Sequence, residues 1–274
     1  MNSSLVILDT ETATLFGAPH LLELGAVRVV DGEIEDQFES FVCPQIEIED
    51  EATEIHGIKQ DDVRNAPLIE EVLESFTEWA GESWLAAHNA PFDAAVLGFE
   101  YARLDMTPPP GVFIDSLTLA RKLIPESIDH KLGTLCQYLE LEEGPLHRAL
   151  SDAVYCWMVI AECIERLEDE DGADPVSFHT LASRCGAPLS IESAQPRFPR
   201  MPQRLRPLEN AMRTHNELTL VYGTGQDTPA HLHVRPRFLF QRKKVGYLEA
   251  ECQRSGTLKT YRLDRVQKVL STSN

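Results

Sequence analysis

The sequence predicts an α/β fold, in which a mixed sheet is flanked by helices, followed by a smaller β domain. Three observations lead to this prediction. Residues 5–42 contain three consecutive strand-like runs, and strand-like and helical segments then alternate up to residue 167. Toward the end of the chain, short strand-like runs follow one another closely. With 274 residues, the chain is long enough for one medium domain and one small one.

The first three strands are expected to form an antiparallel meander. The apolar residues 6–8 are predicted to lie in a buried central strand, and residues 20–30 form a second strand rich in Leu and Val. Asp31 and Gly32 are a hairpin turn signal before a third strand over 35–42. Strands joined by such a tight turn run antiparallel.

Strands and helices alternate in the rest of the first domain. The acidic residues 45–66 are expected to be irregular, and Pro67 suits the first turn of a helix over 67–80. Further strands are expected at 84–87 and 112–114, and further helices at 94–104, 116–124, 131–139 and 146–167.

A second composition begins after residue 168. We expect a first domain over 1–168, a Pro- and Arg-rich linker over 169–207 and a second domain over 208–274. The linker is expected to hold a short helix at 177–184. The second domain is expected to start with a helix over 207–215 and to continue as a small β-barrel or β-sandwich with strands at 217–222, 230–235, 237–240, 246–252 and 257–263.

Composition excludes a membrane protein and a disulfide-rich one. No apolar run approaches the ~18 residues of a membrane span, and the N-terminus lacks the basic and apolar segments of a signal peptide. The six cysteines include no Cys-x-x-Cys pair, so we expect reduced thiols. The sequence therefore predicts a cytoplasmic protein with no membrane partner.

The net charge of −19 is divided unevenly along the chain. Residues 1–170 hold 9 Lys and Arg against 35 Asp and Glu, a net charge of −26, whereas residues 171–274 hold 16 against 9, a net charge of +7. The first part should repel a polyanion except where cations neutralise it, and the second part should attract one. The two parts are therefore expected to have different partners.

Two carboxylates end the first strand. Asp9 and Glu11 lie two residues apart, so in a strand their side chains leave on the same face. Anions held this close repel each other unless a cation lies between them, and Mg²⁺ and Mn²⁺ favour such oxygen ligands. On its own, the pair is more typical of an ordinary surface strand end.

Two more carboxylates occupy similar junctions. Asp93 opens a helix after a strand, and Asp152 lies near the start of the last long helix. His147 precedes Asp152 by five residues, which is a turn of about 500° in a helix, so the two side chains would not share a helical face. We expect His147 in the loop or first turn, where its ring can reach a metal held by Asp152.

These residues belong to three motifs that resemble the DEDD-type 3′→5′ exonucleases of the branch with a His-x-x-x-x-Asp third motif. The motifs are residues 9–12 (Asp-Thr-Glu-Thr), 88–93 (His-Asn-Ala-Pro-Phe-Asp) and 147–152 (His-Arg-Ala-Leu-Ser-Asp). The resemblance covers residues 4–168 and implies an RNase H-like sheet. One departure is that Ala13 follows the first motif where the family usually has Thr-Gly, which implies a different loop beside the terminal nucleotide.

The resemblance also implies an activity. It is the release of nucleoside monophosphates from the 3′ end of a single strand of DNA or RNA, with two Mg²⁺ or Mn²⁺ ions held by Asp9, Glu11, Asp93 and Asp152. Asp9 would bridge the ions, and His147 would be the general base, a role that suits a side chain titrating near neutral pH. Expected substrate-binding residues are Thr10, Thr12, His56, His88 and Asn89, although a role in holding the local backbone is favoured for His88 and Asn89, and His56 suits either packing or substrate contact.

The C-terminal residues 208–270 resemble the WYL domain, an SH3-like β fold linked to nucleic-acid or nucleotide sensing. Gly246 replaces the Trp of the family's name, ahead of Tyr247 and Leu248. The resemblance implies a nucleotide ligand, a nucleic acid or a protein as partner. Candidate phosphate-binding and stacking residues are Arg235, Arg237, Lys243, Lys244, Tyr247, Arg262 and Arg265; the alternative is a solvated basic face with tyrosines in the core.

The main alternative function is a catalytically weak sensor of nucleic acid or nucleotides, built on an exonuclease scaffold. The four carboxylates and His147 are all present, which favours the enzyme. The two readings differ in whether metal-dependent cleavage occurs.

Overall fold

The computed structural model describes residues 4–15, 17–141, 147–171, 175–223 and 228–271. The chain divides into two compact units, Met1–Gln195 and Pro196–Asn274. Each is described here by itself. Within the described ranges, no helix is both long enough and apolar enough to cross a membrane.

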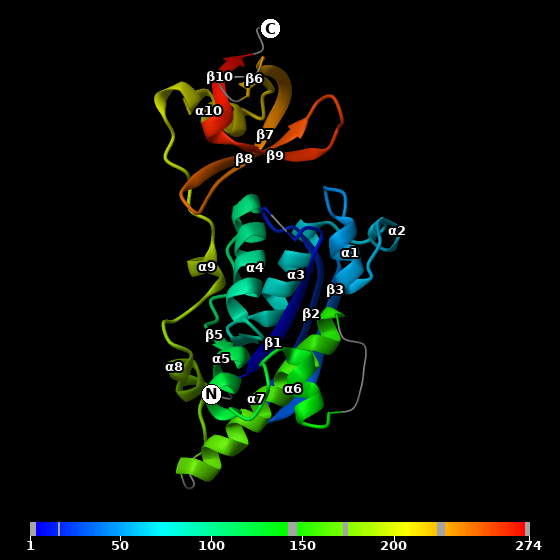
Figure 1. The fold of residues 1–274 in the computed structure, drawn as a ribbon, viewed down its shortest axis with the longest axis vertical. Coiled ribbons are helices and arrows are strands. Elements are labelled where there is room, and N and C mark those ends of the chain that lie inside the picture. Colours follow the sequence, from blue (N-terminus) through cyan, green and yellow to red (C-terminus); the bar gives the residue numbers. More distant parts are fainter. Residues whose placement is uncertain (1–3, 16, 142–146, 172–174, 224–227, 272–274) are drawn as a thin grey trace. The chain divides into compact units, whose positions relative to one another are not determined.

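A five-stranded mixed sheet forms the first unit, in the order β3-β2-β1-β4-β5 (Figure 1). β1, β2 and β3 pair antiparallel, and β4 and β5 are parallel to β1. Asp31 and Gly32 both have positive φ, which suits a tight hairpin turn. The predicted meander and the mixed sheet are confirmed. The strands are β1 (Leu5–Thr12), β2 (Leu21–Val30), β3 (Glu33–Phe41), β4 (Trp84–Ala87) and β5 (Phe113–Asp115).

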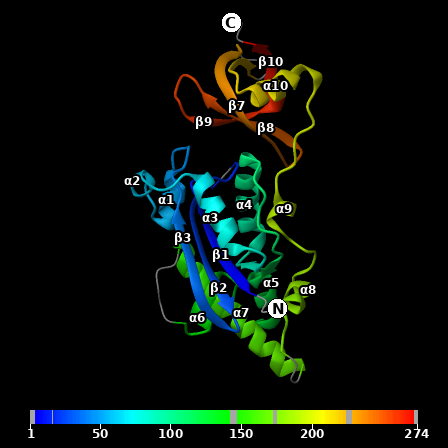
Figure 2. The same ribbon diagram turned by 180° about the vertical axis from the view of Figure 1, so that it is seen from behind.

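Helices cover both faces of this sheet, as the two opposite views show (Figures 1 and 2). Val6 and Leu8 of β1 pack with the α3 and α4 side, and Leu5 and Ile7 pack with the α5, α6 and α7 side. Alternate residues of a strand face opposite layers, so both faces of β1 are apolar up to the point where its carboxylates begin. The helices are α3 (Ile69–Ala80), α4 (Ala90–Leu104), α5 (Ser116–Leu123), α6 (Leu132–Tyr138) and α7 (Ala149–Asp171).

The prediction that residues 45–66 are irregular was wrong. They contain α1 (Asp50–His56) and α2 (Gln60–Val63). α1 ends at Gly57, whose φ of 73° is the left-handed conformation that favours glycine. The helices are too short to show a 3.6-residue apolar period, and only Ile58, Val63 and neighbouring apolar side chains anchor the segment.

The segment expected to be a linker is shared between the two units. α8 (Phe178–Cys185) and α9 (Ile191–Ala194) pack on the first unit, where Ile191 joins the core beside α4 and Leu181 the core beside α7. The N–H of Phe113 donates to the carbonyl of Leu189 at 2.8 Å. Residues 196–207 instead belong to the second unit, where the N–H of Gln241 donates to the carbonyl of Arg197 at 2.8 Å.

The second unit is a five-stranded antiparallel sheet in the order β10-β6-β7-β8-β9. Leu205 and Leu208 pack on its apolar face. Pro236, which has no N–H to donate, lies at a register shift inside β7. The strands predicted at 230–235 and 237–240 are therefore parts of one strand that continues through this proline. The elements are α10 (Arg206–Thr214), β6 (Leu218–Tyr222), β7 (Ala230–Arg242), β8 (Val245–Cys252), β9 (Leu258–Arg262) and β10 (Val266–Ser271).

Candidate metal and substrate site

The end of β1 places Asp9 and Glu11 on one face of the sheet. They continue the row of Leu5 and Ile7, which faces the α7 layer. In the pairing with β2, Asp9 lies opposite Gly25 and Glu11 lies opposite Glu23. The sequence expectation of a shared face is therefore met, and both carboxylates are partly buried.

The first turn of α4 brings Asp93 to the same place. Asp115, at the end of β5, accepts hydrogen bonds from the N–H groups of Asn89 (3.0 Å) and Ala90 (3.1 Å), and so fixes the start of the helix. Asp93 is only 2% exposed. The hydroxyl of Thr10 donates to its Oδ1 at 2.8 Å, so Thr10 holds a carboxylate of the site, which differs from the expected substrate contact.

The start of α7 contributes Asp152 and His147. The backbone N–H of His147 donates to Oδ2 of Asp152 at 3.2 Å. His147 has a φ of 62°, an uncommon conformation for a residue other than glycine, just before the helix begins. Asp152 is buried, and its Oδ1 has no hydrogen-bond partner among the described residues. A buried carboxylate oxygen without a partner is what a metal ligand looks like before the metal binds.

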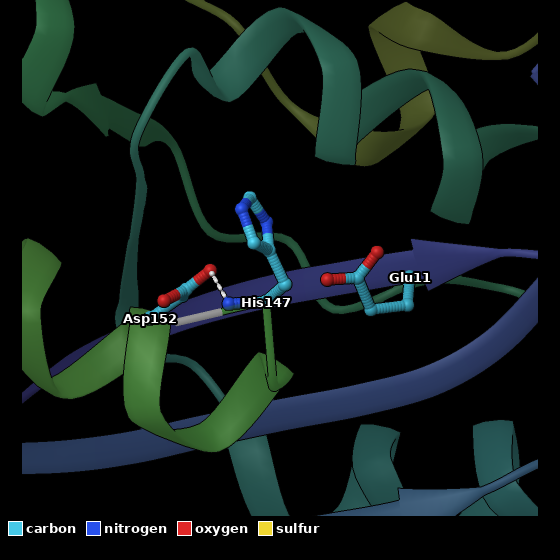
Figure 3. A group of neighbouring side chains, drawn as sticks. All are labelled: Glu11, His147 and Asp152. Carbon is cyan, nitrogen blue, oxygen red and sulfur yellow. Dashed lines mark hydrogen bonds between the residues drawn. The ribbon is translucent and has the colours of Figure 1, made fainter. Parts of the chain in front are cut away.

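Glu11, His147 and Asp152 converge on one point (Figure 3). One ligand atom from each lies within 4.8 Å of the others. In Figure 3, Glu11 comes from β1, and His147 and Asp152 come from the start of α7, with the hydrogen bond between them drawn as a dashed line. Carboxylate oxygens are the ligands that Mg²⁺ and Mn²⁺ favour, and the imidazole lies beside them.

Burial and mutual repulsion keep protons on these carboxylates. Burial raises the pKa of Asp9 well above its ordinary value, and the charges of Asp93, Asp152 and Glu11 raise it further. Burial raises the pKa of Glu11, and the negative charge of Asp152 raises it further, to about 8. Burial raises the pKa of Asp93 to about 7, against the hydrogen bond from Thr10, and burial also raises the pKa of Asp152. A divalent cation would offset this repulsion, so the residues present fit the metal ions that the sequence implied.

His56 lies beside this cluster. It is 7% exposed, and its Nδ1 accepts the N–H of Ile58 at 3.0 Å, whereas its Nε2 has no partner among the described residues. Burial lowers the pKa of His56. The Thr12 backbone raises this pKa and the charge of His147 lowers it, so the ring lies near Thr12 and His147. The hydroxyl of Thr12 donates to the carbonyl of Thr14 at 2.9 Å. His56 is therefore the expected substrate residue that keeps a free ring nitrogen beside the site.

His88 instead has a structural position. Its Nε2 donates to the carbonyl of His130 at 2.8 Å, so its Nδ1 accepts from the hydroxyl of Ser116, also at 2.8 Å. Burial lowers the pKa of His88, which keeps the ring neutral. Both ring nitrogens are used within the protein, as in the structural role that the sequence favoured for His88. Asn89 has a φ of 68° and donates its N–H to Asp115, so its backbone shapes the start of α4.

Sequence reasoning assigned no role in the site to Asp115, Glu23 or Arg148, which hold it together. Asp115 fixes α4, and Glu23 contacts Arg148 and the start of α7. The available signals were local: Glu23 is a lone charge in an apolar strand, and Asp115 ends an apolar run in the way that Asp9 does. What these side chains contact depends on pairings between distant segments.

In the second unit, the basic residues contact carboxylates of the same unit. Arg235 lies 2.7 Å from Glu217, Arg237 2.8 Å from Glu251, and Arg262 2.7 Å from Asp264. A phosphate would have to compete with these carboxylates for the three guanidinium groups. Tyr247 stacks on the buried ring of Phe240 at a centroid distance of 5.2 Å.

Three other expected basic residues have no carboxylate partner among the described residues. Lys243, Lys244 and Arg265 are exposed, and the structure describes no ion pair for any of them. The two lysines form the turn between β7 and β8 with positive φ. Gly246 follows that turn, and a Cβ on it would lie 2.9 Å from Cδ1 of Leu263 and 3.1 Å from Cβ of Pro199, so a larger side chain would require Leu263 to move.

Comparisons with known proteins agree with this geometry. The sequence model of a family described as "Exonuclease" matches residues 6–159, and that of the "WYL domain" matches residues 203–270. The chain is 36% identical over 167 residues to "DNA polymerase III PolC-type" of Oceanobacillus iheyensis, which covers 61% of this chain and 12% of that protein. The chain thus spans only about a tenth of the length of such curated relatives.

Solved structures resemble the chain as well. "Exonuclease X in complex with 5' overhanging duplex DNA" is 29% identical and covers 66% of this chain and 99% of that chain, with a TM-score of 0.51. "Crystal structure of E. coli Exonuclease I in complex with a dA16 oligonucleotide" is 13% identical and covers 90% of this chain and 55% of that chain, with a TM-score of 0.52, which is a likeness of fold.

Proposed function

Since the chain belongs to the exonuclease family, we propose that it is a metal-dependent 3′→5′ exonuclease that releases nucleoside 5′-monophosphates from a single-stranded 3′ end of DNA or RNA. The observation that carries this proposal is the convergence of Glu11, His147 and Asp152, with Asp9 close enough for Asp93, Asp152 and Glu11 to repel its charge. Exonuclease X and Exonuclease I, which the chain resembles, were solved with DNA.

Asp9, Glu11, Asp93 and Asp152 would hold two Mg²⁺ or Mn²⁺ ions. Bound there, the ions would supply a polarised phosphoryl oxygen, a hydroxide-like water and stabilisation of the leaving oxygen. The protein's own contribution is geometric: Thr10 orients Asp93, and the His147 backbone orients Asp152. These hydrogen bonds leave the remaining carboxylate oxygens to act as ligands.

His147 acts as the general base. A ring nitrogen takes the proton of the attacking water while the water oxygen bonds to the terminal phosphorus. The bond between phosphorus and the 3′-oxygen of the preceding nucleotide breaks, and that oxygen takes a proton from solvent. The products are a nucleoside 5′-monophosphate and a strand one nucleotide shorter that ends in a 3′-hydroxyl. His147 is exposed at the edge of the cluster, as a base that exchanges protons with solvent needs to be.

Substrate contacts follow from what surrounds the carboxylates. The free Nε2 of His56 and the nearby Thr12 backbone are suited to the terminal nucleotide. Phe92, in the first turn of α4 beside Asp93, is 49% exposed and offers a ring on which a base can stack. The acidic surroundings oppose contact with the rest of a polyanion, which favours an end over the middle of a strand.

For the second unit we propose an SH3-like fold that contacts nucleic acid, a nucleotide or a protein. Its five short antiparallel strands and the match to the WYL domain support the fold. Of the basic residues that the sequence indicated for phosphate, Lys243, Lys244 and Arg265 are exposed and have no described ion pair. A cytoplasmic location fits the six cysteines, all of which are free thiols.

The test of the function is digestion of matched DNA and RNA oligonucleotides, single- and double-stranded, with Mg²⁺, Mn²⁺ or EDTA. We expect cleavage with either metal, none with EDTA, and a preference for a single-stranded 3′ end. Binding of the strands without cleavage under any metal condition would support the sensor alternative.

A further inference from the structure

Glu23 is a fully buried carboxylate beside the site. It lies on β2 opposite Glu11, and its side chain is 0% exposed. Its Oε1 accepts hydrogen bonds from Nε (3.1 Å) and Nη2 (2.8 Å) of Arg148, and its Oε2 accepts the backbone N–H of Ala149 at 3.2 Å. Every one of these donors belongs to the residues that join His147 to α7.

The same piece of α7 rests directly on the backbone of β2. Gly25 is two residues from Glu23, and a Cβ at Gly25 would lie 2.1 Å from the nitrogen of Leu150. The first turn of α7 can therefore occupy its place only because position 25 carries no side chain. Glu23 and Gly25 restrain the same turn in two independent ways, one by directed hydrogen bonds and one by close approach.

A buried carboxylate is a costly way to join two elements. An apolar side chain would pack a strand against a helix without desolvating a charge, and Glu23 lies near Glu11 as well. What an apolar contact lacks is direction. A guanidinium and a carboxylate that share two hydrogen bonds fix both distance and orientation.

We propose that Glu23 and Arg148 form a positioning pair that holds His147 and Asp152 in register over β1, and this inference rests on the proposed function. His147 is then restrained on both sides: its own N–H is held by Asp152, and the next residue is held by Glu23. The pair acts through His147 and Asp152 and makes no contact with substrate. Groups that orient metal ligands and bases in this way typically affect activity by about 10- to 100-fold.

Two conservative variants test the pair. Glu23→Gln keeps an acceptor for Ala149 and nearly the same shape, but loses the charged contact with Arg148. Arg148→Lys keeps the charge and loses the planar double hydrogen bond. Glu39→Gln is the matched control, because Glu39 also lies near Arg148 (3.7 Å) but is 46% exposed, whereas Glu23 is fully buried. Thermal unfolding of each full-length variant checks the fold.

The readouts are kcat and KM for a short oligonucleotide at saturating Mn²⁺, and Mn²⁺ affinity measured by titration without substrate. We expect kcat to fall about 10- to 100-fold in Glu23→Gln and about 10-fold in Arg148→Lys, with KM within about threefold of wild type. Mn²⁺ affinity should fall in both. Glu39→Gln should match wild type within about twofold. A purely electrostatic role would leave Arg148→Lys like wild type, and a substrate contact would raise KM.

The two proposals fail in different ways. If wild type cleaves and both folded variants cleave at the wild-type rate, the positioning pair is refuted and the exonuclease stands. If wild type cleaves nothing, the exonuclease is refuted, and the Mn²⁺ titration decides on the pair: equal affinities in wild type, Glu23→Gln and Arg148→Lys would overturn it. Should Glu23→Gln fail to fold, Arg148→Lys carries the test, since the Arg148 side chain is 40% exposed.

Discussion

At the end of β1, the carboxylates of Asp93, Asp152 and Glu11 each raise the pKa of Asp9, whereas in the second unit Arg235 and Arg237 are held by carboxylates of that unit. The first region gathers charge of one sign, whereas these arginines of the second region are paired with carboxylates. Residues 1–170 carry a net −26 and residues 171–274 a net +7, so charge totals alone would have assigned nucleic-acid binding to the second region.

The difference teaches that unbalanced charge marks a site better than net charge does. Crowded carboxylates cost free energy that only a bound cation or a proton can offset, so their retention needs a functional reason. A guanidinium in an ion pair must give up its partner before it can bind a phosphate. The predictions below test this contrast.

The largest effect is expected from removing a carboxylate of the first region. Asp9→Ala and Asp152→Asn should reduce cleavage of a labelled oligonucleotide to background, because each removes a metal ligand. Both should unfold at or above the wild-type temperature in EDTA, since repulsion among the remaining anions is smaller. Near-wild-type turnover in Asp9→Ala would contradict the assignment of the ligands.

The next effect concerns His147. His147→Ala should lose about 10²- to 10⁴-fold in kcat, the usual range for general-base help, and should still bind Mn²⁺. Its pH–rate profile should lose the ascending limb that the base produces in wild type. A mutant rate equal to wild type from pH 6 to 9 would assign the base to another group.

A smaller effect is expected in the pH dependence of stability without metal. Folding raises the pKa of Glu11 to about 8 and of Asp93 to about 7, whereas the unfolded values lie near ~4. Between these limits the folded protein binds more protons than the unfolded chain, so stability falls as pH rises. The unfolding temperature in EDTA should therefore drop from pH 6 to pH 8.5, and Mg²⁺ should restore it most at the higher pH.

Glu11→Gln is the matched variant for that measurement. It removes one of the raised carboxyl groups, so its curve of unfolding temperature against pH in EDTA should be flatter than that of wild type. If wild type in EDTA is equally stable at pH 6 and pH 8.5, the carboxylates do not repel one another as described.

The smallest effect is expected in the second region. Replacing Lys243, Lys244 and Arg265 with Ala should weaken binding to a long single strand, measured in Ca²⁺ to suppress cleavage, and should reduce the salt slope by about 2, at ~0.7 for each phosphate contact. The matched triple replacement of Arg235, Arg237 and Arg262 should change the slope less, because their carboxylates already neutralise them. Equal slopes in both triple variants and wild type would mean that this region does not hold the strand.

Much of the first unit could be predicted because its signals are local. A few neighbouring residues are enough to identify the apolar run before Asp9, the turn at Asp31 and the short strand before His88. The motifs then follow, since strand ends and helix starts meet at one edge of such a sheet. That Asp9, Glu11, Asp93, His147 and Asp152 belong together needed only their order and the resemblance.

What could not be predicted depends on pairing between distant residues. Glu23 and Arg148 are 125 residues apart, and their contact requires the position of α7 on β2. Arg235 faces Glu251 directly across β7 and β8, a register that no local pattern specifies. β10 was missed because a register shift between Val266 and Lys268 breaks the alternation that identifies a strand.

The most direct test of the central claim is a time course on a single strand labelled at its 5′ end, with the released products identified. If the carboxylates at the end of β1 hold metal ions for 3′→5′ hydrolysis, Mn²⁺ should produce a ladder that shortens one nucleotide at a time from the 3′ end and releases nucleoside 5′-monophosphates. Asp152→Asn, and wild type in EDTA, should leave the strand intact. Immediate release of the labelled 5′ nucleotide, fragments from the middle of the strand, or a ladder that persists in EDTA would contradict the account.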